Sequence, residues 1–227
     1  VYAQNRSVEF FGFLADDKLE GRRTGTAGEK LAYEYISTEF TKSGLTAKGN
    51  NGSFIQAFEV NEGLQINPST HLFINGFDLE LDKEYFPFMF SANASVEAAP
   101  SIALRESGTV WFWDIKDKLE ENKDNPHFDL TDAIKIKAND VAAKGATGLI
   151  VYNTSGIKDE LKFEPKAKNE RVKIPVLYVT ESIKKKYLYD ETAALDIKLK
   201  VDIGDKTRTG HNVIGFIDNG AANTIIL

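Results

Sequence analysis

Three histidines, His71, His127 and His211, are the side chains best suited to bind a metal or to move a proton near neutral pH. None belongs to a His-x-Asp, His-Glu-x-x-His or calcium-loop pattern. The absence of cysteine excludes thiolate zinc sites and cysteine nucleophiles. His71 falls in an expected strand, His127 in a charged loop and His211 just before a strand, so packing or surface roles are expected. The residues by themselves predict no metal ligand.

A glycine-punctuated segment could in principle cradle a phosphate group. Its glycines are Gly21, Gly25 and Gly28, and the last is followed by Glu29 and Lys30 rather than by Lys and Ser or Thr. A dinucleotide fingerprint would require a preceding strand, whereas the residues before this segment have helical spacing. The pattern favours a tight structural loop between two helices.

The remaining polar candidates are incomplete. Ser155 follows an expected strand, a position typical of nucleophilic serines, but it lies in no Gly-x-Ser-x-Gly elbow and has no histidine nearby in sequence. The carboxylates Asp16 and Asp17 are expected to be solvated or to hydrogen-bond within a loop. Lys184–Lys186 lie toward a helix C-terminus, where positive charge is favourable. We therefore assign no catalytic residue and no substrate-binding residue from these patterns.

Composition limits the classes of protein to consider. The chain has 227 residues, 42% of them hydrophobic and 11% aromatic, which is enough for a sizeable core. Its net charge of −6 argues against nucleic acid or an anionic membrane surface as the main partner. No apolar run is long enough to span a membrane. The start, Val1-Tyr2-Ala3-Gln4, is typical of the end of a signal-peptide cleavage site, or else an arbitrary boundary; the first reading implies export.

Hydrophobic spacing predicts elements along the whole chain. Expected helices cover 8–20, 28–43, 130–144 and 181–189; expected strands cover 54–60, 70–75, 77–81, 110–113, 148–152, 174–179, 194–203 and 212–217, and a further strand begins at 224. Thr26 and Glu29 are expected to form a capping box, and Gly44 to end the second helix. The segments 91–101 and 158–173 are expected to be loops, 114–124 a solvated segment and 204–210 a polar linker. The strand–helix–strand order from 110 to 152 predicts a parallel pair.

Three of these segments resemble one family. Gly21 to Gly28 (Gly-Arg-Arg-Thr-Gly-Thr-Ala-Gly), with the helix that ends at Gly44-Leu45, is similar to the N-terminal signature of the di-zinc aminopeptidases, metallopeptidase family twenty-eight, which includes the glutamate carboxypeptidase type. Phe54–Phe58 resembles the first strand of their catalytic sheet. His211–Gly215 and Thr224–Leu227 resemble the next two strands.

The segment between them, 65–205, resembles a protease-associated (PA) domain. The similarity centres on Lys137–Asn153 and continues at Ile174–Val179. The resemblance implies three parts: 1–64 from the peptidase domain, 65–205 as the PA domain, and 206–227 as the continuation of the peptidase sheet. It implies an α+β fold class, with an open β-sandwich or barrel-like PA domain with helices and a partial α/β remnant built from both termini.

What the resemblance implies for function concerns a parent enzyme. Such enzymes use two zinc ions to release N-terminal amino acids, and their first ligand follows the strand that Thr224–Leu227 resembles. No residue of this chain matches a ligand or the general base, so the chain alone is expected to be non-catalytic and to hold no cofactor. The PA domain is expected to shape substrate access, with loop 91–101 or loop 158–173 facing the cleft.

Two other interpretations remain open. One is a free-standing PA-type module that binds peptides or proteins without catalysis, and the other is an unrelated enzyme with an unrecognised site. The expected partners are peptide substrates of the parent enzyme, with no nucleic acid and no membrane span. An incomplete peptidase sheet would also leave an apolar surface, so self-association is expected.

Overall fold

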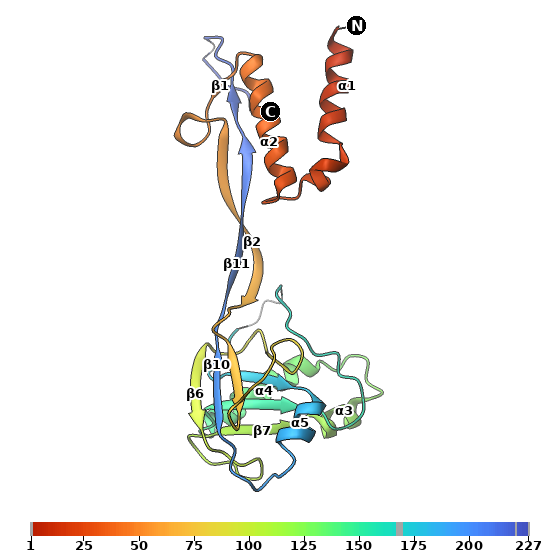
Figure 1. Ribbon diagram of the computed structural model, residues 1–227, viewed down its shortest axis with the longest axis vertical. Helices are drawn as coiled ribbons and strands as arrows, with labels where there is room; N and C mark the ends of the chain where they lie inside the picture. The colour runs from red at the N-terminus through yellow and green to blue at the C-terminus, as the bar shows by residue number, and fades with distance from the viewer. Residues whose placement is uncertain (1, 167–169, 221, 227) are drawn as a thin grey trace. The chain divides into compact units, whose positions relative to one another are not determined.

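The computed structural model (Figure 1) describes residues 2–166, 170–220 and 222–226. The chain divides into two compact units, unit 1 (Val1–Glu62 with Thr207–Leu227) and unit 2 (Gly63–Lys206). The boundaries between them fall within two paired strands, β2 (Ile55–Ile66) and β11 (Ile203–Val213). Each unit is considered by itself below.

Unit 1 consists of helices at its N-terminal side and short strands. Its elements are α1 (Tyr2–Leu14), η1 (Asp17–Arg22), α2 (Ala27–Lys42), β1 (Thr46–Ala47), η2 (Asn50–Gly52) and β12 (Gly215–Phe216), together with the adjoining parts of β2 and β11. β1 and β12 form an antiparallel pair. The helix predicted for 8–20 instead ends at Leu14 and is followed by the 3-10 turns of η1.

Local signals define α2. The Thr26 hydroxyl accepts the Glu29 main-chain N–H at 3.4 Å, which caps the first turn as predicted. At the other end Gly44 adopts φ +76°, and Leu45 donates its N–H to the Phe40 carbonyl at 3.0 Å. This left-handed termination is the one that the glycine predicts.

Unit 1 has almost no hydrophobic core. Leu19 and Ala32 are its only buried hydrophobic side chains within the described residues. Its exposed large hydrophobic residues are Val8, Phe11, Leu31, Phe58, Ile217, Ile225 and Ile226. Because helices and strands gain most of their stability from burying one apolar face, unit 1 presents surface that is suited to further packing.

Unit 2 is built on two four-stranded sheets. The first has the order β4 (Phe77–Asp78), β3 (His71–Ile74), β10 (Ile197–Val201), β6 (Ala94–Ala98) and is antiparallel; the second has the order β5 (Tyr85–Pro87), β9 (Val176–Val179), β8 (Gly148–Tyr152), β7 (Val110–Asp114). β7, β8 and β9 are parallel, as predicted for the first pair, and β5 is antiparallel to β9. The helices of this unit are α3 (Lys116–Asn122), α4 (Leu130–Ala143) and α5 (Glu181–Tyr187).

The core of unit 2 has two layers on opposite faces of the β8 sheet. Ile150 and Tyr152 point into a cluster shared with β3 and β10, whereas Leu149 and Val151 point into a cluster shared with α4. Alternate residues of a strand face opposite sides, so a strand that is buried on both faces is apolar throughout. The five residues of β8 are all buried.

Several sequence expectations were wrong. The 91–101 segment is not a loop, because β6 pairs with β10 within it. The expected linker 204–210 belongs to β11. The segment 114–124 is mostly exposed, as expected, but it contains α3, which the sequence did not predict. Residues 224–226 form no strand, and Ile225 and Ile226 are highly exposed; Leu227 lies outside the described residues.

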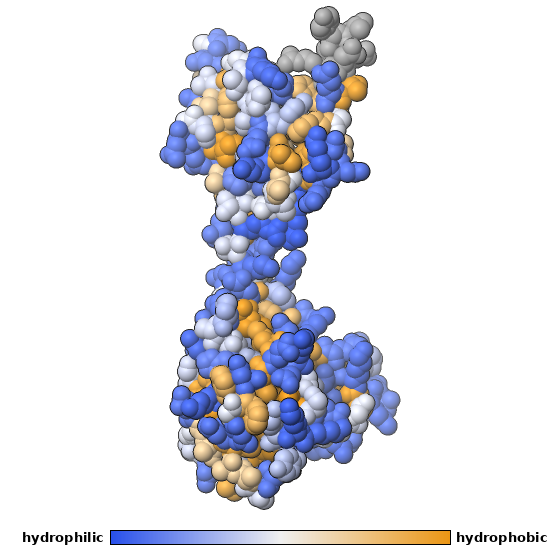
Figure 2. Space-filling model, viewed as in Figure 1, coloured by the Kyte–Doolittle hydropathy of each residue, from blue (hydrophilic) through white to orange (hydrophobic). Residues whose placement is uncertain are grey.

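The α+β class agrees with the structure, and of the expected open β-sandwich or barrel-like arrangement the described sheets form no closed barrel. The sheets of the described residues are small and open at their edges. None of the helices there is both long and apolar enough to cross a membrane. Figure 2 shows hydrophobic residues scattered among polar ones on the face drawn.

Candidate functional site

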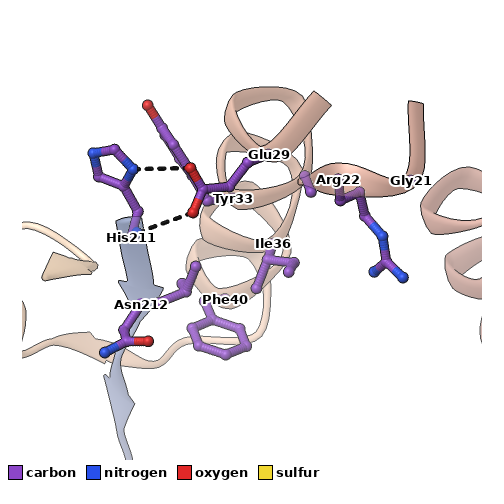
Figure 3. A pocket seen from close by; sticks show the side chains of 10 residues that line it. Gly21, Arg22, Glu29, Tyr33, Ile36, Phe40, His211 and Asn212 are labelled. Carbon is purple, nitrogen blue, oxygen red and sulfur yellow. Dashed lines mark hydrogen bonds and ion pairs between the residues drawn. The ribbon is translucent and has the colours of Figure 1, made fainter. Parts of the chain in front are cut away.

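The described pocket of unit 1 is a groove of about 550 Å³ (Figure 3). One face of α2 forms a wall, the end of η1 a rim, and the end of β11 the opposite wall. The lining residues are Gly21, Arg22, Glu29, Ala32, Tyr33, Ile36, Phe40, His211, Asn212 and Val213. The α2 residues among them recur every three or four positions, which places them on one side of the helix.

Glu29 and His211 form the polar centre of the groove, although they are 182 residues apart. The His211 main-chain N–H donates to Glu29 Oε1 at 3.0 Å, and the His211 ring Nδ1 lies 3.3 Å from Glu29 Oε2. Gly25 donates its N–H to the same Oε2 at 2.7 Å. The Tyr33 ring covers the imidazole, with 4.7 Å between ring centres. Figure 3 shows these side chains converging from α2 and β11.

These contacts correct one part of the predicted capping box. The carboxylate of Glu29 was expected to accept the Thr26 N–H, but it accepts the Gly25 N–H and binds His211 instead. The reciprocal half of the motif is therefore replaced by a tertiary contact that ties the start of α2 to β11.

The same contacts set the protonation of Glu29. Partial burial raises the pKa of the Glu29 carboxyl, but the hydrogen bonds from Gly25 and His211 outweigh burial and leave the pKa below its usual value. The carboxylate is thus charged at neutral pH, and both of its oxygens already accept hydrogen bonds. This arrangement suits a structural tie better than a general base.

A second tie joins the glycine loop to β2 and β11. Glu62 pairs with Arg208 at 2.6 Å and with Arg23 at 3.1 Å, and Arg208 also donates to the Thr24 carbonyl at 2.7 Å. The hydrogen bond from Arg208 is the main reason why the pKa of Glu62 is lowered. Loop and strands, distant in sequence, are therefore held together by charge as well as by packing.

The glycines of the loop are required by close approach. A Cβ atom at Gly28 would lie 1.8 Å from the Leu19 carbonyl oxygen. A Cβ atom at Gly25, which has φ +75°, would lie 2.3 Å from the Arg208 side chain. The segment is thus the tight structural loop that the sequence predicts.

The other histidines lie elsewhere. His71 is in β3, where its Nδ1 lies 3.0 Å from the Ser69 carbonyl oxygen and its ring packs on Phe73. His127 is exposed in the segment before α4. Neither belongs to the groove of unit 1.

Ser155 belongs to a polar turn in unit 2, as the sequence favours. Its hydroxyl donates to Asn153 Oδ1 at 2.7 Å and accepts the Ile157 N–H at 3.0 Å. Asn153 in turn donates to Asp159 at 2.8 Å, and the Tyr178 hydroxyl does the same. No histidine takes part in this network within the described residues, so the network lacks the histidine of a serine–histidine pair.

The charged candidates also have structural roles. Asp16 accepts the Lys18 N–H at 2.9 Å, and this hydrogen bond lowers the pKa of Asp16. Lys184 lies in the last turn of α5, where its ammonium donates to the Leu188 carbonyl at 2.6 Å. Both arrangements are those expected at helix ends.

The donor set does not fit a zinc centre. Zinc sites in enzymes use three protein ligands, whereas the groove offers Glu29 and His211, and these bind each other. Among the described residues, no group of three or more His, Cys, Asp or Glu side chains could hold a metal ion.

The sequence missed the Glu29–His211 and Glu62–Arg208 contacts. Both join residues separated by most of the chain, and no local pattern marks them. The one available signal was that His211 opens a segment with family resemblance.

Comparison with solved structures finds proteins that are similar to this chain. It is similar to an aminopeptidase from Aneurinibacillus sp. strain AM-1, with 18% identity over 95% of this chain and 49% of that one and a TM-score of 0.44. It is also similar to a zinc aminopeptidase from Bacillus subtilis, with 19% identity over 91% of this chain and 44% of that one and a TM-score of 0.43. A third similar structure is a peptidase M28 precursor from Shewanella amazonensis SB2B, with 13% identity over 91% of this chain and 51% of that one and a TM-score of 0.37.

The chain thus spans about half the length of the solved structures that it matches. No protein-family model matches the sequence, and no curated protein matches it significantly. All three TM-scores lie below 0.5, so the functional proposal rests on contacts within this chain.

Proposed function

We propose that this chain is the N-terminal and PA-domain portion of an exported, zinc-dependent aminopeptidase. In this proposal 1–64 and 206–227 belong to the peptidase domain, and 65–205 is a PA domain that shapes access of peptides to the active site. The two zinc ions, their ligands and the general base belong to the rest of the parent enzyme. The chain contributes scaffold and substrate access rather than the chemical step.

The observation that carries the proposal is the contact between the two resembling segments. The glycine loop and the segment that begins at His211 are separated by most of the chain, yet Glu29 binds His211 and Arg208 binds the Thr24 carbonyl. The family resemblance requires these segments to belong to one domain, interrupted by an insertion. Unit 2 occupies the place of that insertion in the sequence.

The scarcity of buried apolar residues in unit 1 also supports the proposal. With two buried hydrophobic side chains in the described residues, unit 1 gains little of the burial that stabilises an independent domain. A portion of a larger peptidase domain would have this property, because its missing neighbours would cover the exposed apolar surface.

The test compares the chain with the native protein of the source organism. Its intact mass is measured first, and release of an N-terminal amino acid from a chromogenic substrate is then assayed for both proteins. We expect a native mass well above that of this chain, activity in the native protein that a chelator removes and zinc restores, and none in the chain alone. A native mass close to that of this chain, or chelator-sensitive activity of the chain itself, would contradict the proposal.

One segment of unit 2 is a proposed border of the substrate cleft. The stretch 158–173 contains no helix or strand in its described residues. Asp159 and the buried Val172 anchor it, so deleting the stretch would damage the unit. Alanine at the exposed Lys158, Glu160 and Lys162 is a milder test in the native enzyme. We expect altered kinetics on long peptides only. Unchanged kinetics on long peptides would contradict the proposal that this stretch borders the substrate cleft.

A free-standing peptide-binding module is the second candidate. The observation that favours it is that both hydrophobic core clusters lie entirely in unit 2. Residues 63–206, expressed alone, should then fold and bind labelled peptides with the affinity of the whole chain. Binding that requires unit 1 or the parent enzyme would argue against this alternative.

A further inference from the structure

Strand β6 is an open edge of the antiparallel sheet of unit 2. The sheet order places β10 on one side of β6 and no strand of the described residues on the other, and Figure 1 shows β6 at the margin of the unit. Its half-buried residues alternate with two exposed ones, Ser95 and Glu97. The other edge strands differ, because β4 has two residues, β5 has three, and β7 is buried over Val110–Phe112. β6 is therefore the longest edge strand with exposed residues in the described part of unit 2.

The pairing of β6 with β10 shows which main-chain groups of β6 point outward. Leu195 donates its N–H to the Pro100 carbonyl at 2.8 Å, which fixes the hydrogen-bonded positions of this antiparallel pair. Such positions recur at every second residue, so the β6 residues bonded to β10 are Ala94, Val96 and Ala98. The main-chain N–H and C=O groups of Ser95 and Glu97 therefore point away from β10, and they make no hydrogen bond within the described residues.

Charged side chains without ion-pair partners lie beside this edge. Glu97 is opposite Lys198 in β10, and Ser95 is opposite Lys200. Glu97, Lys198 and Lys200 form no ion pair within the described residues. The exposed face of the sheet therefore presents an acidic and a basic position two residues apart along the strands.

One register pairs this edge with its own copy. With a two-fold axis at Val96, antiparallel pairing places Ser95 opposite Glu97 of the partner subunit and uses all the outward main-chain groups of both residues. Strands lie about 4.8 Å apart, so the backbones of Glu97 and Lys200 of the partner subunit are roughly 10 Å apart with a small serine between them. Their long side chains can meet above that serine. Shifting the register by two residues places two glutamates or two serines opposite each other and loses these charge pairs.

We propose that β6 is a dimerisation edge, at which a second copy of this chain pairs antiparallel through Ser95 and Glu97. The two four-stranded sheets then form one continuous sheet. A second copy fits better than an unrelated peptide, because both the hydrogen-bonding groups and the charges of the edge are complementary to themselves. Proteins commonly protect an open edge with lysine, proline or a bulge, and β6 has none of these. The inference concerns unit 2 alone and is independent of the proposed peptidase role.

The test uses the absence of cysteine from the chain. Ser95→Cys and Glu97→Cys proteins are mixed in equal amounts and oxidised gently, and the rate of disulfide formation is measured. In the proposed register the two thiols of the mixed pair lie opposite each other, with about 5.5 Å between Cα atoms, a distance that a disulfide spans. Two copies of one variant place their thiols on a diagonal of about 7–8 Å, which is too long. Glu120→Cys on α3, which removes the same charge at an exposed position, replaces Glu97→Cys in the control mixture.

We expect the mixed disulfide to form at least about tenfold faster than either homodimer or the control pair, because only its thiols meet in the required geometry. Equal rates in all mixtures would overturn the inference. Faster formation of the Ser95→Cys homodimer would overturn the proposed register. Association through the exposed apolar surface of unit 1 would favour neither position of β6, so it cannot produce the expected result.

Amide hydrogen exchange tests the same edge without a thiol. The amides of Ser95 and Glu97 should exchange more slowly as the concentration of the chain is raised. Ser95→Pro should abolish this dependence at Glu97 while leaving the fold intact, because proline is tolerated on an edge strand where the N–H faces solvent. Exchange that is independent of concentration would overturn the inference. Exchange that slows only when a peptide is added would identify a peptide as the occupant and would overturn the second copy.

The charge pairs are tested by exchanging their signs. Glu97→Lys places like charges together in the proposed register, so it should weaken dimerisation by about tenfold, a typical size for a charge reversal at an interface. Adding Lys200→Glu to this variant should restore part of the loss, whereas adding Lys158→Glu, at an exposed lysine outside the sheet, should not. Equal effects of the two second substitutions would overturn the role of Lys200.

Discussion

Replacing Gly28 by alanine is expected to separate η1 from α2. The added Cβ would lie 1.8 Å from the Leu19 carbonyl oxygen and 2.6 Å from its carbonyl carbon. The obstacle is backbone rather than the end of a flexible side chain, so one of the two elements has to move. Leu19, which is 1% exposed, would leave its site as η1 shifts.

The size of the effect follows from the close contact. Overpacking typically costs about 1–3 kcal/mol, and a rigid backbone obstacle places Gly28→Ala toward the upper end. Since each 1.4 kcal/mol changes an equilibrium constant by about tenfold, opening of α2 should increase by roughly 5- to 150-fold. We expect this increase in the amide hydrogen exchange of α2.

The chain contains its own reference signals for this experiment. Both tryptophans, Trp111 and Trp113, are in β7 of unit 2, so their fluorescence reports on that unit and should be unchanged. Gly12→Ala is the matched control, because its added Cβ in α1 would have no atom within 4 Å apart from its chain neighbours and the nearby backbone of the same helix. It should slow exchange in α1, since alanine favours an exposed helix interior by up to about 1 kcal/mol. Unchanged α2 exchange in Gly28→Ala would refute the steric argument.

Three further predictions concern burial, pH and association. Ser91→Ala should destabilise unit 2 by about 1–3 kcal/mol, because the buried Ser91 hydroxyl accepts the Val176 N–H at 2.8 Å. The measurement is urea unfolding followed by tryptophan fluorescence, and Ser95→Ala, at an exposed serine, should change the free energy of unfolding little. Equal destabilisation by the two substitutions would contradict this role of Ser91. The pKa of Glu29 is lowered by folding, so its contribution to stability is present above its usual value of 4.5 and is lost as pH falls through the lower pKa of the folded state. Glu29→Gln should therefore reduce the loss of hydrogen-exchange protection that α2 shows as the pH is lowered. An unaltered pH dependence would refute the stabilising contact between Glu29 and His211. Finally, the exposed apolar surface of unit 1 should cause the isolated chain to self-associate, and a constant monomer mass in sedimentation over a wide concentration range would count against it.

Local signals in the sequence predicted most elements of unit 2. The apolar runs at β7 and β8, with an amphipathic helix between them, define a parallel pair because each strand is buried on both faces. The cap at Thr26 and the left-handed Gly44 depend on neighbouring residues only, and both are where the sequence places them. Such features need no information from distant parts of the chain.

Two of the strands that the sequence missed, β6 and β11, had different causes. β6 is short and rich in alanine and serine, although its half-buried Ala94, Val96 and Ala98 do alternate with exposed residues. The polar stretch 204–210 belongs to β11, which pairs only with β2 in the described sheets. A two-stranded ribbon buries little on either face, so it carries no hydrophobic period that could reveal it.

The sequence by itself thus determined where the chain turns, where α2 begins and ends, and which strands of unit 2 are buried on both faces. Only the tertiary structure decided the groove, because Glu29 meets His211, and Arg208 meets Glu62, across most of the length of the chain. Periodicity and capping are local properties of a sequence. A charge pair or a strand partner depends on the shape of the whole fold, which no short window of residues contains.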